Sequence, residues 1–525
     1  MRSFGAGTVR VSHDLVHDTI LTPMWISFQI HNHHYRQTSI VGAMPRISPE
    51  LHLTLRLPET DAPLRHRIAE SILDEIRVGR LRPGDPLPST RALAEHLTVA
   101  RASVVDAYDE LCSSGYANAR AGSGTRIAPG ADVAARAHVA SHTTTRSSER
   151  ASSAAPEKPA AVWDLTPGHP DPALISTVDW RRAWRSAAAA AVTSDVPGPD
   201  AHPELRRSLA EHLRRTRGIV ARPDELVIVP GVGAALRTLV AAAGLGGRDV
   251  VFEEPGYSRA RTVLDGSGVR TRCVTVDGDG LDPALLRATD AAAYCTPAHQ
   301  YPMGARMPVG RRAGLVADAA AAGTVIIEDD YDGEFRYDVS ALPALRSIDR
   351  GPECVAYVGT ASKILTPSIR VAWVIAPPAL RPGLVRALDA SGEACCAITA
   401  LALAHFIDSG ALSRHLARAS RTYSARRAAF VAALQQQLSA VDTDGVGLAG
   451  IEAGLHVVLT LPGSVDDVAV SAELRDHGVT VPSLADYRTT PGGPRGLVCG
   501  YARLPESQAR GAAEAIGRVV RRHLG

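Results

Sequence analysis

The stretch VAYVGTASK, residues 355–363, decides the fold of the larger part of this chain. Lys363, at its end, and Lys158 are the only lysines in the sequence, because arginine supplies every other non-histidine positive charge. A lysine kept against this bias indicates chemistry that arginine cannot perform, since a guanidinium stays protonated and is no nucleophile. Lys158 lies in a polar stretch and needs no such explanation. We therefore expect Lys363 to form a Schiff base.

Short apolar runs alternate with helical patterns from about residue 162 to the end of the chain. Four of them are LVIV (226–229), VVF (250–252), TVII (324–327) and VAYV (355–358). Fully apolar strands between helices are typical of a parallel sheet that is covered on both faces. The sequence therefore predicts an α/β domain over residues 162–525.

Other residues of this domain suit pyridoxal phosphate, which needs a lysine, an acid for its ring nitrogen, phosphate donors and a stacking group. Asp329 ends an apolar strand, although an acid there can also be a helix cap or a surface residue. The turn PGVG (230–233) precedes an alanine-rich helix whose N–H groups can hold phosphate, although such glycines often only close a turn. Tyr257 follows another strand and is suited to stacking or to a core position.

A small helical unit precedes this domain. Leu64, Ile68, Ile72 and Ile76 recur every four residues and predict an amphipathic helix, and two shorter helices are expected at about 89–97 and 101–113. The last two have helix-turn-helix spacing, and a hairpin around GSG (122–124) would form a wing that touches phosphates. Spacing of this kind also occurs in interaction modules that bind no DNA.

The runs LRPGDPLPSTRALA (81–94), VVDAYDEL (104–111) and GSGT (122–125) resemble the GntR family of winged-helix regulators. The resemblance covers about residues 51–127 and implies a winged helix-turn-helix DNA-binding domain over 51–129. Thr98 and Ala100 depart from the family, which commonly has glycine and serine there. The residues expected to contact double-stranded promoter DNA are Ser89, Thr90, Arg91, Arg101, Ser103, Arg120 and Gly124.

The runs EEPGY (253–257), TPAHQYPMG (296–304), IEDDYDGEF (327–335), GTASK (359–363) and GYARL (500–504) resemble the MocR subfamily of GntR regulators. The resemblance implies a pyridoxal-phosphate domain of aminotransferase class I/II, fold type I. It makes Lys363 the Schiff-base lysine, Asp329 the partner of the pyridine nitrogen and Tyr331 a donor to the phenolic oxygen. The other expected cofactor-binding residues are Tyr257, Val232, Gly233, His299, Thr360, Ser362 and Arg370.

The resemblance also concerns the effector. Arg259 matches an arginine that binds the effector carboxylate in relatives that respond to γ-aminobutyrate. Asp486 stands where those relatives have a second such arginine, which argues against that effector. Arg488 or Arg495 would then substitute, or pyridoxal phosphate itself would be sensed.

Composition restricts the remaining possibilities. The net charge of +2 gives no general affinity for nucleic acid, so DNA binding must rest on local clusters. Seven cysteines without a C-x-x-C pair indicate reduced thiols and a cytoplasmic protein. No run is long enough to span a membrane, and the histidines at 31–34 are expected to bind no metal. Residues 1–50 are expected to be a disordered extension and residues 130–161 a flexible linker.

We therefore expect a transcription regulator that senses pyridoxal phosphate, or a small amine or amino acid, through aldimine formation. The resemblance also implies a head-to-tail homodimer. The alternative is an active aminotransferase with an autoregulatory DNA-binding domain, because fold and cofactor do not decide between sensing and turnover. A DNA-independent scaffold is disfavoured by the complete set of expected cofactor residues.

Overall fold

The computed structural model divides the chain into two compact units, Met1–Ala155 and Pro156–Gly525. It describes residues 55–60, 62–120, 124–133, 135, 162–191, 197–198, 200–337, 342–439 and 445–524. The expected extension at 1–50, most of the expected linker and the tip of the expected wing lie outside the described residues.

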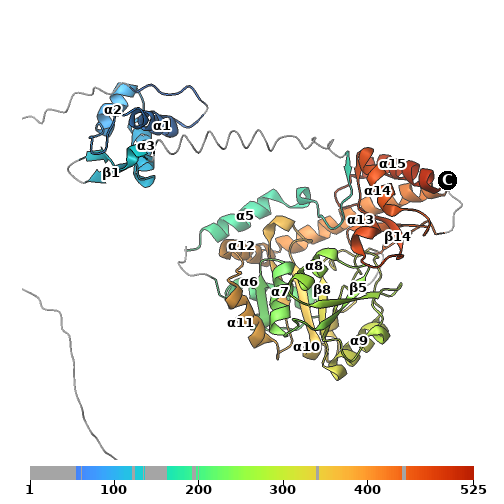
Figure 1. Cartoon of the computed structure of the whole chain (residues 1–525). Helices are drawn as coiled ribbons and strands as arrows, with labels where there is room; N and C mark the ends of the chain where they lie inside the picture. Colours follow the sequence, from blue (N-terminus) through green and yellow to red (C-terminus); the bar gives the residue numbers. More distant parts are fainter. Residues whose placement is uncertain are drawn as a thin grey trace, which may run out of the picture. The chain divides into compact units, whose positions relative to one another are not determined.

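The described part of the N-terminal unit contains the helices α1, α2 and α3 and a hairpin (Figure 1). Its core joins the buried stripe of the first helix, Ile68, Ile72 and Ile76, to Val104 and Leu111 of the third. The expected amphipathic helix is therefore confirmed. The elements are α1 (Leu64–Arg77), α2 (Thr90–Leu97), α3 (Arg101–Ser113), β1 (Ala117–Arg120) and β2 (Gly124–Ile127), and the two strands pair antiparallel.

The ends of α2 and α3 show the cap at Ser89 and the two departures, at Thr98 and Ala100, that the sequence indicated. Ser89 caps α2, because its hydroxyl accepts a hydrogen bond of 3.1 Å from the Ala92 N–H. Thr98 ends this helix in the left-handed region, with φ of 54°, where glycine would be unstrained. Ala100 begins α3 without a side-chain cap. The helix-turn-helix is therefore formed, at the cost of one strained residue and one missing cap.

The N-terminal unit continues beyond the hairpin. Ala131 and Ala135 are buried in its core, and the Arg77 Nε donates a hydrogen bond of 3.3 Å to the Ala135 carbonyl. The expected boundary at residue 129 therefore lies inside packed structure, because small alanines in a polar stretch give little sign of burial. The packed unit extends at least to Ala135.

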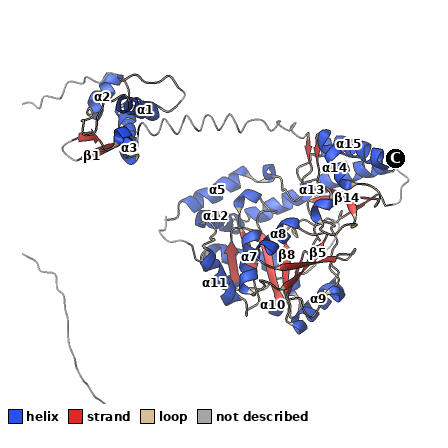
Figure 2. Cartoon of the chain, in the orientation of Figure 1, coloured by secondary structure: helices blue, strands red, loops and turns tan. Residues whose placement is uncertain are grey.

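The larger unit is built on a mixed sheet, which Figure 2 shows in red between blue helices. Among the described residues the strand order is β4-β10-β9-β8-β7-β5-β6. The strands are β4 (Leu226–Val229), β5 (Asp249–Glu254), β6 (Arg270–Thr275), β7 (Ala292–Cys295), β8 (Val325–Asp330), β9 (Val355–Thr360) and β10 (Ala372–Ile375).

The expectation of a parallel sheet is only partly correct. Strands β6, β5, β7, β8 and β9 are parallel, but β10 runs antiparallel to both β9 and β4. The four residues of β10 are all buried, so the strand reads as a continuous apolar run whatever its direction. The direction of β10 therefore could not be predicted from the periodicity of its apolar residues.

Helices cover both faces of this sheet, as expected. One apolar cluster joins the sheet to α7 (Val232–Ala242), α8 (Ser258–Gly266) and α11 (Arg381–Ser391). On the opposite face two clusters join it to α6 (Pro203–Arg217), α9 (Val309–Ala322) and α12 (Ala397–Asp408). The short α10 (Gly351–Cys354) precedes β9, and α5 (Thr177–Ala188) packs on α12.

The C-terminal part adds a second, smaller sheet of order β11-β12-β14. No helix among the described residues is long and apolar enough to cross a membrane. The elements are α13 (Ala411–Leu438), β11 (Gly447–Ala449), β12 (His456–Leu461), α14 (Asp467–Asp476), β13 (Val479–Thr480), β14 (Arg495–Gly500) and α15 (Glu506–Leu524). Strand β13 pairs in parallel with β3 (Trp163–Asp164), the first strand of the larger unit.

Thr98→Gly should stabilise the N-terminal unit by about 0.5–1 kcal/mol. A non-glycine residue in the left-handed region costs about 1–3 kcal/mol, which the substitution removes. The greater conformational freedom of glycine in the unfolded chain offsets about 0.5–1 kcal/mol of this gain. The measurement is the calorimetric unfolding transition of this unit in the full chain. Gly79→Ala, at φ of 79°, is the matched control and should destabilise. Equal stability of Thr98→Gly and wild type would contradict the assignment of strain.

Candidate functional site

Lys363 lies just after β9, and its amine is hydrogen-bonded to a segment that is distant in the sequence. Its Nζ donates a hydrogen bond of 2.7 Å to the carbonyl of Gly168, which comes from the first turn of the larger unit. Burial lowers the pKa of Lys363 below its usual range, although the charges of Asp332 and Asp329 oppose this shift. A lowered pKa leaves more of the amine neutral and therefore nucleophilic.

Asp329 is buried at the end of β8, the strand next to β9. Its Oδ2 accepts a hydrogen bond of 2.7 Å from the hydroxyl of Tyr294 on β7, while its Oδ1 is buried without a hydrogen-bond partner. Burial raises the pKa of Asp329 to about 6, although the bond from Tyr294 opposes the rise. A buried acceptor that lacks a donor is costly, so this oxygen suits an N–H group of a ligand.

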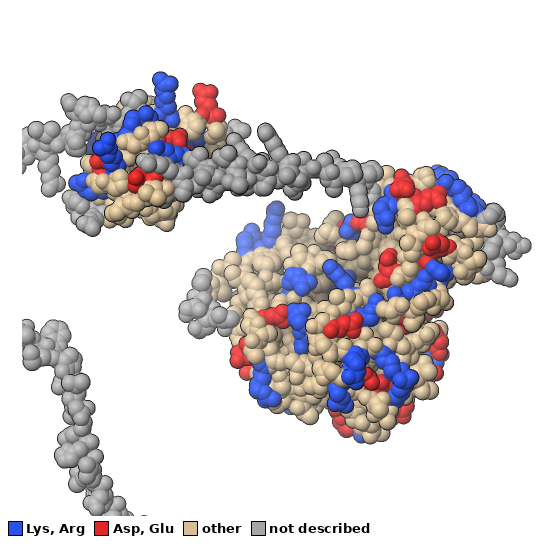
Figure 3. Space-filling view, viewed as in Figure 1, with Lys and Arg blue, Asp and Glu red and all other residues tan. Residues whose placement is uncertain are grey.

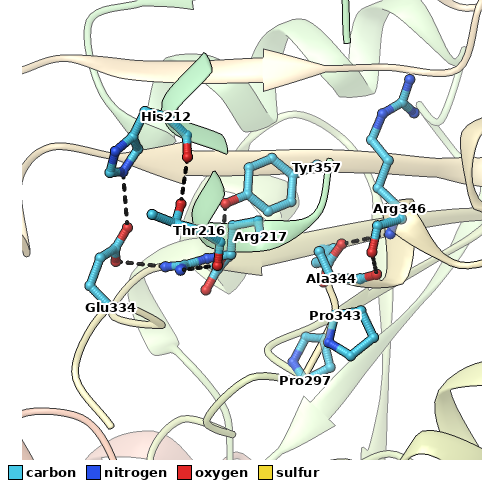
Figure 4. Close-up of polar contacts among 12 residues, drawn as sticks. His212, Thr216, Arg217, Pro297, Glu334, Pro343, Ala344, Arg346 and Tyr357 are labelled. Carbon is cyan, nitrogen blue, oxygen red and sulfur yellow. Dashed lines mark hydrogen bonds and ion pairs between the residues drawn. The ribbon is translucent and has the colours of Figure 1, made fainter. Parts of the chain in front are cut away.

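The acids on either side of Asp329 face the opposite side of the sheet, because side chains alternate along a strand. Asp330 forms a buried ion pair with Arg217 of α6 and accepts a hydrogen bond of 2.8 Å from the Tyr357 hydroxyl. Arg217 also pairs with Glu334 at 2.8 Å, and Figure 4 shows this guanidinium between Glu334 and Tyr357. These contacts fix the end of β8 and so hold Asp329 in place.

Tyr331 and His299 meet beside this strand end. The Nδ1 of His299 lies 2.9 Å from the Tyr331 hydroxyl oxygen and 3.2 Å from the Asp332 carboxylate. An ionised Asp332 favours a proton on Nδ1, and the hydroxyl hydrogen of Tyr331 is then available to another acceptor. The arrangement is therefore compatible with the expected role of Tyr331 as a donor to a phenolic oxygen.

The expected phosphate ligands gather where α7 begins. The amides of Val232 and Gly233 are in the first turn of this helix, where N–H groups have no partner inside the helix. Arg370 reaches the same turn, because its Nη2 donates a hydrogen bond of 3.1 Å to the Pro230 carbonyl. A Cβ at Gly231 would lie 2.8 Å from that Nη2, so the close approach requires glycine.

Thr360 and Ser362, the two hydroxyl residues of the lysine loop, follow β9. The Thr360 hydroxyl donates to the Val371 carbonyl at 3.3 Å and accepts from the Ser362 N–H at 3.1 Å. These bonds shape the loop, and the Ser362 side chain is half-buried. Helix amides, hydroxyl groups and one arginine are the donors that a phosphate monoester requires.

Tyr257 lies at the start of α8 and is half-buried. Its ring packs edge-on against Tyr301, with centroids 5.5 Å apart. Burial raises the pKa of Tyr257, and the charge of the exposed Arg259 nearby opposes this rise. The same charge adds to the effect of burial in lowering the pKa of Lys363. Arg259 therefore lies near both Tyr257 and the lysine.

Taken together, these residues fit pyridoxal phosphate. Asp329 would offer an unused buried oxygen to the ring nitrogen, Tyr331 would offer a hydroxyl to the phenolic oxygen, and the α7 turn would hold the phosphate. When bound, this group supplies an aldehyde for Lys363 and an electron-withdrawing ring. The residues of the chain would bind and orient the group.

The residues expected at DNA lie at the exposed starts of α2 and α3. Arg91 and Arg101 are both exposed, and the Arg101 Nε donates to the Thr90 hydroxyl at 3.2 Å, which links the two helix starts. Ser103 is half-buried, and Gly124 opens β2 with φ of 76°. Ser89 is used as the cap of α2. Arg120 ends β1, the strand before the expected wing tip.

Comparison with known proteins agrees with both units. The family model for bacterial regulatory proteins of the gntR family matches residues 64–127, and the model for aminotransferase class I and II matches residues 166–516. The HTH-type pyridoxine biosynthesis transcriptional regulator PdxR of Corynebacterium glutamicum is 34% identical, over 88% of this chain and 97% of that protein. The probable rhizopine catabolism regulatory protein MocR of Rhizobium meliloti is 30% identical, over 86% and 92%.

The chain belongs to the MocR subfamily of GntR-type transcription regulators. Solved aminotransferases share the fold of its larger unit. An archaeal alanine:glyoxylate aminotransferase superposes with a TM-score of 0.63 at 23% identity, over 73% of this chain and 95% of that one. The aspartate aminotransferase of Thermus thermophilus with maleate gives 0.60 at 22% identity, over 73% and 96%. The unit therefore has the fold type I architecture.

In this MocR-type chain, the two arginines proposed as substitutes for the arginine missing at position 486 have other partners. Arg488 donates to the carbonyls of Gly493 and Pro494, each at 2.8 Å, and lies 3.4 Å from the buried carboxylate of Asp467. Arg495 pairs with the same Asp467 at 3.1 Å.

Asp486 caps the short helix η6 (Leu484–Tyr487), accepting from the Ser483 N–H at 3.0 Å. The structure therefore brings only Arg259, of the three proposed effector arginines, to the lysine.

Sequence reasoning overlooked two residues that touch the cofactor residues. Tyr294 reads as one more apolar residue of a buried strand, and only the neighbouring strand shows that its hydroxyl meets Asp329. Gly168 lies 195 positions before Lys363 in a polar turn, and no sequence spacing connects the two. Both contacts depend on how distant segments pack.

Lys363→Ala should abolish the visible absorbance of protein mixed with pyridoxal phosphate, because alanine has no amine to form the imine. The control is Lys158→Ala, which removes the other lysine of the chain and should leave the band intact. Absorbance titration of the full chain is the measurement. Persistence of the band in Lys363→Ala, or its loss in Lys158→Ala, would contradict the assignment.

Affinity for pyridoxal phosphate should fall as the pH drops below about 6. Asp329 takes up a proton near this pH, and the neutral carboxyl cannot form an ion pair with a protonated ring nitrogen. The loss should approach about tenfold per pH unit by linkage. Asp329→Asn should lose this step and should weaken binding at about pH 8 by about 1.5–3 kcal/mol. A pH profile that is unchanged in the variant would refute the role of Asp329.

Arg91→Ala and Arg101→Ala should each weaken DNA binding by about 1–3 kcal/mol if they contact bases or phosphates. Fluorescence anisotropy at fixed salt is the measurement. Arg214→Ala, which removes an exposed arginine paired with Glu211 in the larger unit, is the charge-matched control and should bind as wild type does. Unchanged affinity in both helix variants would show that these helix starts do not face DNA.

Proposed function

We propose that this regulator binds its promoter according to whether pyridoxal phosphate occupies the site at Lys363. The observation that carries the proposal is the unpartnered buried oxygen of Asp329 in the same site as a lysine of lowered pKa. The larger unit pays for these groups in stability, and binding of the cofactor relieves that cost. The folded state of the larger unit is therefore expected to be more stable with the cofactor bound than without it.

Pyridoxal phosphate itself is the effector that these contacts favour. A free amino acid in such a site is normally oriented through its carboxylate, and a bidentate arginine is the usual means. Arg488 and Arg495 are engaged by Asp467, so Arg259 is the one remaining candidate of the three. The name of the Corynebacterium relative, a regulator of pyridoxine biosynthesis, points in the same direction.

Sensing requires that the cofactor change the relation between the larger unit and the DNA-binding unit. Such a change needs a difference in affinity of the cofactor for two conformations, which formation of a covalent bond can provide. A head-to-tail homodimer would present two winged helices to repeated half-sites on DNA, and its half-site spacing would follow from its symmetry.

The test is anisotropy of the full chain on DNA upstream of its own gene, with and without pyridoxal phosphate, at fixed physiological salt. The salt is fixed because phosphate contacts make affinity strongly salt-dependent. We expect specific binding that changes with the cofactor in wild type and not in Lys363→Ala. Specific binding that is indifferent to the cofactor in wild type would refute the proposal.

A second candidate function, aminotransfer, is favoured by the completeness of the cofactor residues in an aminotransferase fold. It predicts that an amino acid converts the protein-bound cofactor to its pyridoxamine form and releases a keto acid. A screen of amino acids by absorbance, with the keto acid measured separately, distinguishes the two. Turnover by any of them would make the chain an enzyme as well as a regulator.

A further inference from the structure

The first segment of the larger unit runs into the cofactor site. Strand β3 pairs with β13, and the pairing continues where the Leu165 N–H donates to the Thr480 carbonyl at 2.8 Å. The Leu165 carbonyl in turn accepts from the Gly500 N–H of β14 at 2.8 Å. Four residues after Asp164, the chain reaches Lys363. Residues 163–169 therefore connect the expected linker with the lysine.

Gly168 is the residue that makes the contact. Its carbonyl accepts the 2.7 Å hydrogen bond from the Lys363 Nζ, and the residue is buried with φ of 71°. A Cβ at this position would lie 2.8 Å from the Nζ, so a side chain here would displace the amine. Both the backbone conformation and the approach of the lysine therefore require glycine.

We propose that residues 163–169 belong to the cofactor site and report its state, because the Gly168 carbonyl holds the free amine of Lys363 and loses it when the amine is bound. The inference rests on the proposed function and adds its means of transmission. It assigns to Gly168 and its segment a part in the site that the family resemblance did not give them.

The chemistry of imine formation requires the loss of this hydrogen bond. Condensation forms a C=N bond between the Nζ and the aldehyde carbon of pyridoxal phosphate, and the aldehyde oxygen leaves as water with two hydrogens from the nitrogen. An ammonium has three N–H donors, whereas the imine nitrogen keeps at most one. That one is adjacent to the phenolic oxygen of the cofactor. The Gly168 carbonyl is then a buried acceptor without its donor, which is unfavourable. Movement of the segment that lets this carbonyl find another donor would lower the free energy.

The position of the segment in the chain gives this movement a consequence. Residues 136–161 join the two units in sequence, and β3 is the first strand after them. Asp164 also pairs with the exposed Arg503 at 2.7 Å, and its Oδ1 accepts from the Thr166 hydroxyl at 2.6 Å. Release of Gly168 therefore acts on a short, bonded segment at the point where the linker meets the larger unit.

The test is hydrogen–deuterium exchange of the full chain alone, with pyridoxal phosphate and with pyridoxamine phosphate. The last compound has the same ring and phosphate but an amine in place of the aldehyde, so it fills the site without forming the imine. We expect pyridoxal phosphate to speed exchange in residues 163–169 severalfold, and pyridoxamine phosphate to leave it unchanged. Lys363→Ala should abolish the effect of pyridoxal phosphate.

Gly168→Ala tests the same contact without the cofactor, because its Cβ would push the amine from the carbonyl. Exchange in residues 163–169 should already be fast in this variant, and pyridoxal phosphate should change it little. Gly247→Ala is the matched control, since Gly247 has φ of 68° but no atom within 4 Å of an added Cβ. Identical exchange in the two variants would overturn the inference.

The two failures are distinguishable. If pyridoxal phosphate produces the visible band but exchange in residues 163–169 matches that with pyridoxamine phosphate, this inference is wrong and the cofactor site stands. If no band forms in wild type, the proposed function fails and the inference fails with it.

Discussion

The burial of Asp329 beside the half-buried Lys363 is the constraint on which the rest of the larger unit depends. A carboxylate in the protein interior is costly unless it is fully paired, and one of its two oxygens has no partner. The cost is maintained because β8 and β9 are adjacent in the sheet and because Arg217 and Tyr357 fix Asp330, the next residue. Buried groups of this kind are concentrated at functional sites.

The C-terminal part is hydrogen-bonded to the end of β5, close to Tyr257. Glu254, at the end of β5, accepts hydrogen bonds from the backbone N–H groups of Thr489 and Thr490. The Gly256 N–H donates to the Tyr487 carbonyl at 2.9 Å, and His456 contacts the Pro302 carbonyl at 2.8 Å. Strand β3 also joins this C-terminal part, because it pairs with β13 and Leu165 bonds to Gly500 of β14.

Features that depend on local pattern were accessible from the sequence. Lys363 was proposed from its rarity, and the expected helix at about 101–113 is α3, because turns on both sides of it are recognisable in the sequence. Residues that act through distant packing were not predictable. Nothing in the sequence indicated that Arg488 and Arg495 both pair with Asp467. Nothing in it indicated that the carbonyl of Gly168 accepts a hydrogen bond from Lys363 either.

Burial caused the two errors in the description of the fold. A buried strand has no polar face, so the reversed direction of β10 left no trace in its composition. Ala131 and Ala135 look like linker residues because alanine contributes little apolar area, yet both are in the N-terminal core. In each case the deciding information was the neighbour across the core, which lies far away in sequence.

The most direct test of the account is peptide mass mapping after borohydride reduction of the full chain with pyridoxal phosphate. Reduction converts an imine into a stable secondary amine and so marks the lysine that carried it. The account predicts a pyridoxyl phosphate adduct on the peptide that contains Lys363 and none on the peptide that contains Lys158. An adduct confined to Lys158, or no adduct at all, would contradict it.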